Sequence, residues 1–161
     1  NDVSADALAA AQALIAKNMD RQVAKGTMTA GDRDAALARI TTTLDLAELG
    51  QSDLIIEAAT EKEDVKNEIF KALQPHLKPE TILTSNTSSI SITRLASRTD
   101  RPEKFMGFHF MNPVPVMQLV ELIRGIATDE ETFKTCHTVV ERLGKTSATA
   151  EDFPEVSFRS L

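Results

Sequence analysis

The sequence predicts an α/β fold built around a largely parallel sheet. Short apolar runs rich in β-branched and aromatic residues alternate along the chain with stretches whose apolar residues recur at helical spacing. One of these runs, residues 53–58, is nearly continuous in its apolar character, which is typical of a strand buried on both faces of a sheet. Because a helix between two strands returns the chain to the same end of the sheet, this alternation favours parallel strands.

The first part of the chain is expected to be helical. Ser4 can cap a helix that continues to residue 25, because Ala, Leu, Gln and Lys are strong helix formers. Thr29 begins a pattern that resembles a capping box and predicts a short helix through residue 38. Two less regular segments follow: a strand over residues 40–43 and a helical turn over residues 44–49.

The rest of the chain predicts strands and helices in alternation. Apolar or β-branched runs predict strands over residues 53–58, 81–85, 105–110, 119–124 and 146–150. Amphipathic stretches predict helices over residues 62–73, 92–97 and 129–143. No repeat, low-complexity tract or linker interrupts this order, so we expect one domain.

Composition and charge exclude several classes of protein. With 42% hydrophobic and 26% charged residues, the 161-residue chain has the balance of an ordinary globular domain. Its net charge of −6 argues against binding to nucleic acid or to an acidic membrane surface. No apolar stretch approaches the ~20 residues that span a bilayer, and no signal peptide is expected. The single cysteine, Cys136, rules out an internal disulfide and fits a reducing cytosol, and its helical setting favours a buried, unreactive role.

The strongest functional signal is the combination of His109 and Glu121. His109 ends one apolar run, and Glu121 lies inside the next. A buried carboxylate is costly unless it is bound, and a histidine at the end of the preceding strand is its obvious partner. A carboxylate that orients an imidazole is what a general base at neutral pH requires. A lone histidine at a strand end is more often structural than catalytic. The hypothesis that His109 and Glu121 are catalytic therefore depends on the residues around them.

Polar segments follow three successive predicted strands, at residues 57–61, 85–89 and 109–112. In open α/β sheets, ligands bind outside the carboxyl ends of the strands, so we expect these segments to meet at one edge. The middle segment consists of hydroxyl and amide side chains and could equally be a turn and a helix N-cap. Three polar strand ends in succession, the last with a histidine, nevertheless form the pattern of an active site.

These segments resemble the L-3-hydroxyacyl-CoA dehydrogenase family, and most of all its bacterial 3-hydroxybutyryl-CoA dehydrogenases. The resemblance is carried by Ser-Asn-Thr-Ser-Ser at residues 85–89, Phe-His-Phe-Met-Asn-Pro-Val-Pro-Val-Met at residues 108–117 and Leu-Val-Glu at residues 119–121. Further residues that fit the family pattern are Glu57, Glu61, Lys66 and Phe70. The resemblance runs from Asp2 to Pro154 and implies a Rossmann-type NAD-binding domain.

The resemblance implies a reaction and the residues that carry it out. The reaction is the reversible, NAD-dependent oxidation of an L-3-hydroxyacyl-CoA, such as 3-hydroxybutyryl-CoA, to the 3-oxoacyl-CoA in fatty acid metabolism. His109 would be the base that takes the hydroxyl proton, and Glu121 would hold its imidazole. Ser88 would hydrogen-bond to the oxygen of the coenzyme A substrate.

The resemblance also implies residues that bind the two ligands, and it implies no metal. Asn86 would lie near the nicotinamide. Asp2 would accept hydrogen bonds from the adenosine ribose, which favours NAD over NADP because a carboxylate repels a 2′-phosphate. Other positions that match NAD contacts are Glu61, Lys66 and Asn112. Positions that match coenzyme A contacts are Asn18 and Lys25, although the family would have a hydroxyl residue at position 18.

The chain departs from the family at both ends. It contains no Gly-x-Gly-x-x-Gly motif, and the glycine-rich turn that cradles a pyrophosphate is missing. The Gly and Asn expected after residue 154 are also missing, so residues 155–161 form a tail that does not match. We therefore expect residues 1–154 to be a partial Rossmann-type domain, truncated in its first β-α-β unit and lacking the C-terminal helical domain. Full-length relatives are expected to be cytoplasmic and to form homodimers through that helical domain.

Two other interpretations compete with a dehydrogenase. The chain could be a non-catalytic module that retains part of the coenzyme A and NAD surface, and a truncated chain is expected to have low activity or none. It could also be a crystallin-like structural relative with the same fold. His109, Glu121 and Ser88 argue against this last interpretation, because a structural protein has no need of them together.

Overall fold

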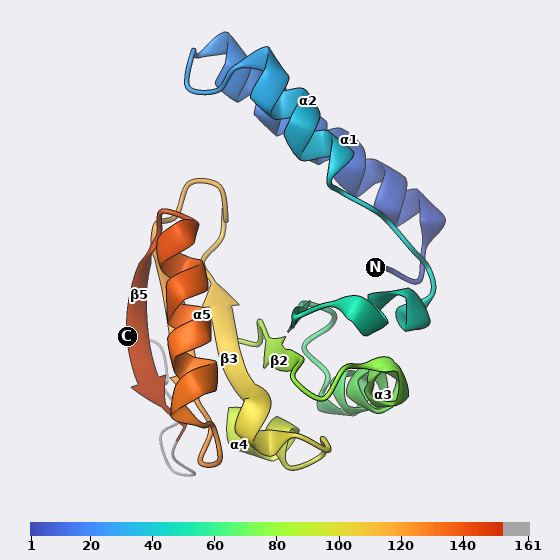
Figure 1. Cartoon of the computed structure of the whole chain (residues 1–161), viewed down its shortest axis with the longest axis vertical. Coiled ribbons are helices and arrows are strands. Elements are labelled where there is room, and N and C mark those ends of the chain that lie inside the picture. The colour runs from blue at the N-terminus through green and yellow to red at the C-terminus, as the bar shows by residue number, and fades with distance from the viewer. Residues whose placement is uncertain (153–161) are drawn as a thin grey trace. The chain divides into compact units, whose positions relative to one another are not determined.

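Residues 1–152 are described by the computed structural model, and they divide into two units. The helical unit is Asn1–Glu48, and the sheet unit begins at Leu49 (Figure 1). Within residues 1–152, no helix has both the length and the apolar character that crossing a membrane requires. The tail predicted over residues 155–161 lies outside the described residues.

The helical unit contains α1 (Ala5–Ala24) and α2 (Ala30–Ala38), as the sequence predicts. The predicted caps are confirmed. Ser4 Oγ accepts a hydrogen bond from Ala7 N at 3.2 Å, and the side chain of Thr29 caps α2 in the same way. These bonds satisfy amide groups that the first turn of a helix leaves without a partner.

The strand predicted over residues 40–43 is wrong, because this segment joins no strand of the described sheet. Two of its hydrogen bonds run to the first residues of the chain, where Thr43 O accepts from Asn1 Nδ2 at 2.9 Å and from Asp2 N at 3.4 Å. β-branched residues favour extended backbone, but a strand exists only where a second strand completes the ladder. The helical turn predicted over residues 44–49 is a 3-10 helix, Leu46–Gln51.

The sheet unit contains five strands in the order β1-β2-β3-β4-β5, with bounds Leu54–Glu57, Ile82–Ser85, Phe105–Phe110, Leu119–Arg124 and Thr146–Glu151. β1, β2 and β3 are parallel, β4 is antiparallel to β3, and β5 is parallel to β4. The prediction of a largely parallel sheet is therefore confirmed, with one antiparallel pair. The connection between β3 and β4 contains no crossover helix, so the chain reverses its direction there.

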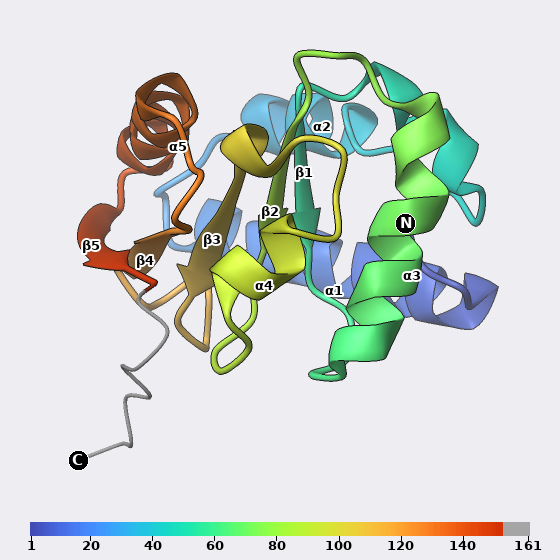
Figure 2. The ribbon, with the colours of Figure 1, turned by 90° about the horizontal axis from the view of Figure 1, so that it is seen from below.

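Helices cover both faces of this sheet. Their bounds are Glu63–Leu73 for α3, Ile92–Ala96 for α4 and Glu130–Arg142 for α5, with short 3-10 helices at Gln74–His76 and Pro102–Lys104. Figure 2 shows α4 and α5 on opposite sides of the strands. This layering of helix, sheet and helix is the arrangement expected of an α/β fold.

Alternate residues of β3 point to opposite faces of the sheet. Met106 belongs to the core cluster that includes Cys136 of α5. Gly107 lies on the other face, where an added Cβ would be 3.0 Å from Ile92 of α4. His109 shares this second face with Gly107, so the strand places the histidine side chain on the α4 side of the sheet.

β1 is less buried than the sequence predicts. Ile55 and Glu57 are 8% and 5% exposed, but Ile56 between them is 40% exposed. The prediction that residues 53–58 are buried on both faces is therefore wrong. β1 is one of the two edge strands of the described sheet and pairs with β2 alone, whereas β2 lies between two strands and its residues are all buried.

Candidate active site

Three parallel strands end at the same edge of the sheet, and Asn86 joins their ends. Asn86 N donates to Glu57 O at the end of β1, at 2.7 Å. The side chain of Asn86 reaches in the other direction, where its Oδ1 accepts from Phe110 N at the end of β3, at 2.8 Å. The three predicted polar segments therefore meet at one edge, as expected for the carboxyl ends of parallel strands.

The predicted hydrogen bond between His109 and Glu121 is confirmed. The two residues are opposite each other in the antiparallel pair of β3 and β4, and His109 Nδ1 lies 2.8 Å from Glu121 Oε2. A carboxylate can only accept, so Nδ1 donates and Nε2 is the nitrogen free to accept a proton in the neutral imidazole. The side chains are 18% and 42% exposed, which leaves the pair open to a ligand.

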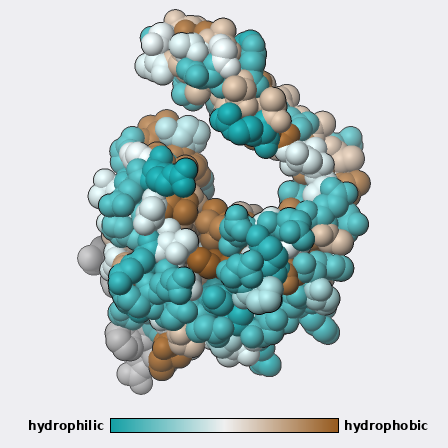
Figure 3. Space-filling view, viewed as in Figure 1, coloured by the Kyte–Doolittle hydropathy of each residue, from teal (hydrophilic) through white to brown (hydrophobic). Residues whose placement is uncertain are grey.

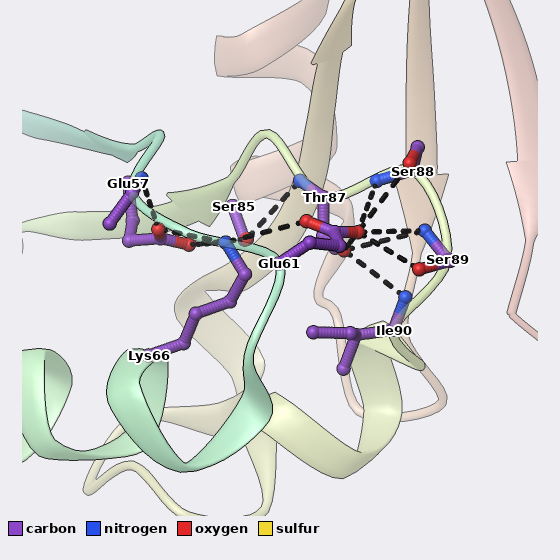
Figure 4. Close-up of polar contacts among 9 residues, drawn as sticks. Glu57, Glu61, Lys66, Ser85, Thr87, Ser88, Ser89 and Ile90 are labelled. Atoms are coloured by element: carbon purple, nitrogen blue, oxygen red, sulfur yellow. Dashed lines mark hydrogen bonds and ion pairs between the residues drawn. The ribbon is translucent and has the colours of Figure 1, made fainter.

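The loop after β2 is bound to one carboxylate, that of Glu61 (Figure 4). Glu61 Oε1 accepts from Ser88 N at 3.0 Å, from Ser89 N at 3.1 Å and from Ser89 Oγ at 3.0 Å, and the Thr87 hydroxyl also donates to it. Ser88 Oγ lies 3.5 Å from the same oxygen. The structure therefore brings together two of the predicted site residues, Glu61 and Ser88.

These contacts keep Glu61 ionised. Partial desolvation alone would raise the pKa of Glu61, but hydrogen bonds from Thr87, Ser89 and Ser88, with the charge of Lys66, together lower the pKa below the ordinary 4.5. The side chain remains 42% exposed, and its Oε2 lies 3.8 Å from Lys66 Nζ. A charged oxygen with access to solvent can accept a hydrogen bond from a ligand hydroxyl or amide.

Next to this loop lies a buried ion pair between Lys66, which the resemblance assigns to the NAD contacts, and Glu57, which it does not assign to the site. Lys66 Nζ is 2.8 Å from both carboxylate oxygens of Glu57, and the two side chains are 1% and 2% exposed. Glu57 also accepts from Ser85 Oγ and from Ala59 N, each at 2.6 Å. The signal that identified Glu121, a carboxylate in an apolar strand, could have found Glu57 as well.

The remaining predicted residues lie elsewhere in the chain. Asn112 is exposed in the loop that follows β3. Asp2, Asn18 and Lys25 belong to the helical unit, with Asn18 inside α1 and Lys25 at its end. Their roles in binding stay predictions.

The sequence matches a known family over almost its whole length. The family profile described as 3-hydroxyacyl-CoA dehydrogenase, NAD binding domain, matches residues 1–153. A 3-hydroxybutyryl-CoA dehydrogenase from Bradyrhizobium diazoefficiens is 56% identical over 154 residues, which are 96% of this chain and 53% of that protein. A probable 3-hydroxybutyryl-CoA dehydrogenase from Bacillus subtilis is 43% identical, over 95% of this chain and 53% of that protein. The chain thus spans about half the length of the curated relatives it matches.

Solved structures match the fold equally well. The crystal structure of 3-hydroxybutyryl-CoA dehydrogenase from Escherichia coli matches with a TM-score of 0.91 and 38% identity, over 95% of this chain and 32% of its own. That of (S)-3-hydroxybutyryl-CoA dehydrogenase from Ralstonia eutropha has a TM-score of 0.91 and 42% identity, over 95% of this chain and 54% of its own. The predicted Rossmann-type fold is confirmed. The chain belongs to the 3-hydroxyacyl-CoA dehydrogenase family, whose NAD-binding domain it matches.

Proposed function

We propose that the complete protein is an NAD-dependent L-3-hydroxyacyl-CoA dehydrogenase that acts on 3-hydroxybutyryl-CoA. The observation that carries this proposal is the hydrogen bond between His109 and Glu121 at the ligand-binding edge of the sheet. The match to an NAD-binding domain and the names of the relatives support the same activity.

The orientation of His109 suits it to act as the general base. Glu121 holds Nδ1, which leaves Nε2 to take the proton of the 3-hydroxyl group of the substrate. The charge of Glu121 stabilises the imidazolium that results. When bound, NAD supplies the acceptor for the hydride from C3, so the products are the 3-oxoacyl-CoA, NADH and a proton on His109. In the reverse direction, His109 returns this proton to the oxygen.

The side chains at the edge of the sheet fit NAD. Glu61 offers a charged acceptor with access to solvent. Asn86 Oδ1 is engaged by Phe110 N, so its Nδ2 is the group that could donate to the nicotinamide. The resemblance assigns Asn112 to the cofactor as well, and Asp2 as the acceptor for the ribose hydroxyls that favours NAD over NADP. It also assigns Lys66, but the Lys66 side chain is 1% exposed and bonded to Glu57, so we place Lys66 behind Glu61 and not in contact with NAD.

Three residues would bind the substrate: Ser88, Lys25 and Asn18. The backbone amide of Ser88 donates to Glu61, so the Ser88 hydroxyl is the group proposed to bind the substrate oxygen. Lys25 would pair with a phosphate of coenzyme A, and Asn18 would contact the same moiety. These two assignments rest on the resemblance to the family.

The resemblance further supports a cytoplasmic homodimer as the working form of the complete protein. Light scattering from the purified complete protein tests the oligomeric state. A mass that corresponds to a monomer at micromolar concentration would contradict this part of the proposal.

Replacing His109 with Gln tests the proposed base. In the complete protein, NADH oxidation that depends on acetoacetyl-CoA is expected to fall by roughly 10²–10⁴ in kcat, the usual contribution of a positioned acid–base group. His137→Gln is the matched control, because His137 also lies beside a glutamate, Glu141, but on the exposed surface of α5. The control should keep the rate of the unchanged protein.

If His109→Gln kept a normal rate and pH profile, proton transfer would have to lie elsewhere. If the unchanged protein bound NADH and coenzyme A without turnover, it would be the non-catalytic binding module that the sequence left open. Either result would overturn the dehydrogenase mechanism given above.

Replacing Glu121 with Gln is expected to cost less than the His109 change. The amide can still contact the ring, but it carries no charge to stabilise imidazolium, the form of His109 that gives its proton to the oxygen of acetoacetyl-CoA, so kcat should fall by a smaller factor. Ser88→Ala should instead raise KM for acetoacetyl-CoA with a smaller effect on kcat. Steady-state kinetics at pH 7 separate the two variants. A Glu121→Gln protein with an unchanged kcat would argue against the orienting role.

A further inference from the structure

The carboxylate of Glu57 is completely enclosed by donors. Its Oε1 accepts from Ala59 N at 2.6 Å and from Lys66 Nζ at 2.8 Å, and its Oε2 accepts from Lys66 Nζ at 2.8 Å and from Ser85 Oγ at 2.6 Å. The side chain is 2% exposed. Glu57 therefore has no surface with which to touch a ligand, and any effect on the site must act through its neighbours.

Each of these neighbours belongs to a different segment of the site (Figure 4). Ala59 lies in the turn that leads from β1 to Glu61. Ser85 ends β2, and its hydroxyl accepts from Thr87 N at 3.3 Å, in the loop that continues to Ser88. One carboxylate thus connects the segment that carries Glu61 to the segment that carries Ser88.

Lys66 extends the same connection to α3 and to Glu61. Its ammonium group lies between two carboxylates, at 2.8 Å from Glu57 and 3.8 Å from Glu61 Oε2. Without the charge of Glu57, Lys66 would have Glu61 as its nearest anion and would compete with the Thr87–Ser89 loop for that carboxylate. Stability alone does not require the pair, because a buried ion pair is often no more stabilising than an apolar pair of similar volume.

We propose that Glu57 is a positioning residue that sets the relative placement of Glu61 and Ser88 by holding the two loops that carry them. This inference rests on the proposed function, in which Glu61 contacts NAD and Ser88 contacts the substrate. Lys66 acts in the same network by balancing the charges of the two glutamates.

Replacing Glu57 with Gln in the complete protein tests the inference. The dissociation constant for NADH, measured by the fluorescence of NADH without substrate, is expected to rise roughly tenfold, the size expected when a charge-assisted hydrogen bond to a ligand is weakened. KM for acetoacetyl-CoA should rise in parallel, and kcat should fall less than KM rises. Glu63→Gln is the matched control, because Glu63 on α3 pairs with Arg94 at 2.8 Å and takes no part in the described hydrogen bonds that hold the Glu61 and Thr87–Ser89 segments. It should leave both constants within about twofold.

Two further variants separate positioning from a loss of folding. Glu57→Leu combined with Lys66→Met replaces the ion pair by apolar side chains, and it should keep the melting temperature yet still weaken NADH binding. Ser85→Ala keeps the ion pair and removes the hydroxyl that joins Glu57 to Thr87 N, so it should raise KM for acetoacetyl-CoA about threefold or more, as expected for the loss of a hydrogen bond.

Three outcomes would overturn the inference. The first is a folded Glu57→Gln protein with unchanged NADH affinity, and the second is a folded double variant with unchanged NADH affinity. The third applies if neither of these two variants folds: an unchanged KM for acetoacetyl-CoA in the Ser85→Ala protein. Because NADH binding is measured without turnover, its result does not depend on whether the unchanged protein oxidises NADH, which is the separate test of the proposed function.

Discussion

Three glutamates near the edge of the sheet differ in chemistry because their neighbours differ. Glu57 is buried and paired with Lys66. Glu61 is 42% exposed and binds the amides and hydroxyls of the β2 loop. Glu121 contacts His109. The same side chain can therefore hold a loop, offer an acceptor to a ligand or orient a base, and its surroundings decide which.

Cys136 shows the same dependence on surroundings. It is a fully buried residue of α5, and this burial raises the pKa of its thiol to about 12. Since the thiolate is the reactive form, the thiol is inert at neutral pH. The buried position expected from the sequence is confirmed, and its lack of reactivity stays a prediction.

Replacing Glu61 with Gln is expected to lower the free energy of unfolding more at pH 7 than at pH 3. The pKa of Glu61 in the folded state lies below the ordinary 4.5, so its ionised form stabilises the fold above that pH. This contribution is lost as the pH falls through the folded-state pKa. Because the side chain is largely exposed, the difference at pH 7 should stay below ~1 kcal/mol.

Urea unfolding at a series of pH values measures this difference. Glu68→Gln is the control. Glu68 is an exposed residue of α3, the helix that follows Glu61, and its replacement removes the same charge. A penalty for Glu61→Gln that is equal at pH 7 and pH 3 would show that the ionised carboxylate does not stabilise the loop.

At the scale of elements, the position of His109 depends on how closely β3 approaches its neighbours. At Gly107, an added Cβ would lie 2.8 Å from Ile123 Cβ on β4 and 3.0 Å from Ile92 Cγ1 on α4. A real Cβ essentially never lies as close as 2.8 Å to another heavy atom, so a side chain at this position would force its neighbours to move. The close approach of β3, β4 and α4 keeps the histidine two residues later in register with Glu121.

Replacing Gly107 with Ala is therefore expected to destabilise the protein by about 1–3 kcal/mol, the usual cost of overpacking a core. Gly125→Ala is a matched control, because its added Cβ would also approach Ile92, but at 3.4 Å, an ordinary contact. It should change the free energy of unfolding by less than ~0.5 kcal/mol. Thermal unfolding of both variants measures the effect, and equal melting temperatures would contradict the packing argument.

At the scale of the whole molecule, burial is divided unevenly between the two units. β2 is buried along its whole length, whereas α1 and α2 have no buried residue. Leu14 of α1 is 57% exposed. In Figure 3, hydrophobic and hydrophilic residues are mixed on the surface of these helices, while most of the visible surface of the sheet unit is hydrophilic. Few apolar contacts therefore stabilise the helical unit.

Native-state hydrogen exchange should report this difference. The amides of β2 and β3 are expected to exchange only on global unfolding, and those of α1 and α2 to exchange at least tenfold faster through local opening. Exchange measured by NMR or mass spectrometry at pH 7 separates the two groups. Equal protection in α1 and β2 would mean that the two units unfold together.

The sequence by itself determined most helices and strands, because caps and hydrophobic periodicity act within a few residues of each other. It also determined the His109–Glu121 pair, because two successive apolar strands joined by a proline-containing loop place such residues opposite each other. Membership of the family followed from motifs that are contiguous in the chain.

Only the tertiary structure decided which polar groups share a partner. Glu57 bonds to Ser85 across 28 positions, and Glu61 to Ser89 across the same separation, through the register of β1 with β2. The predicted strand over residues 40–43 failed for the same reason, since a ladder needs a second strand that local propensity cannot supply. Register and burial are set by packing between distant segments, and for this reason the buried network at Glu57 becomes visible only in the folded chain.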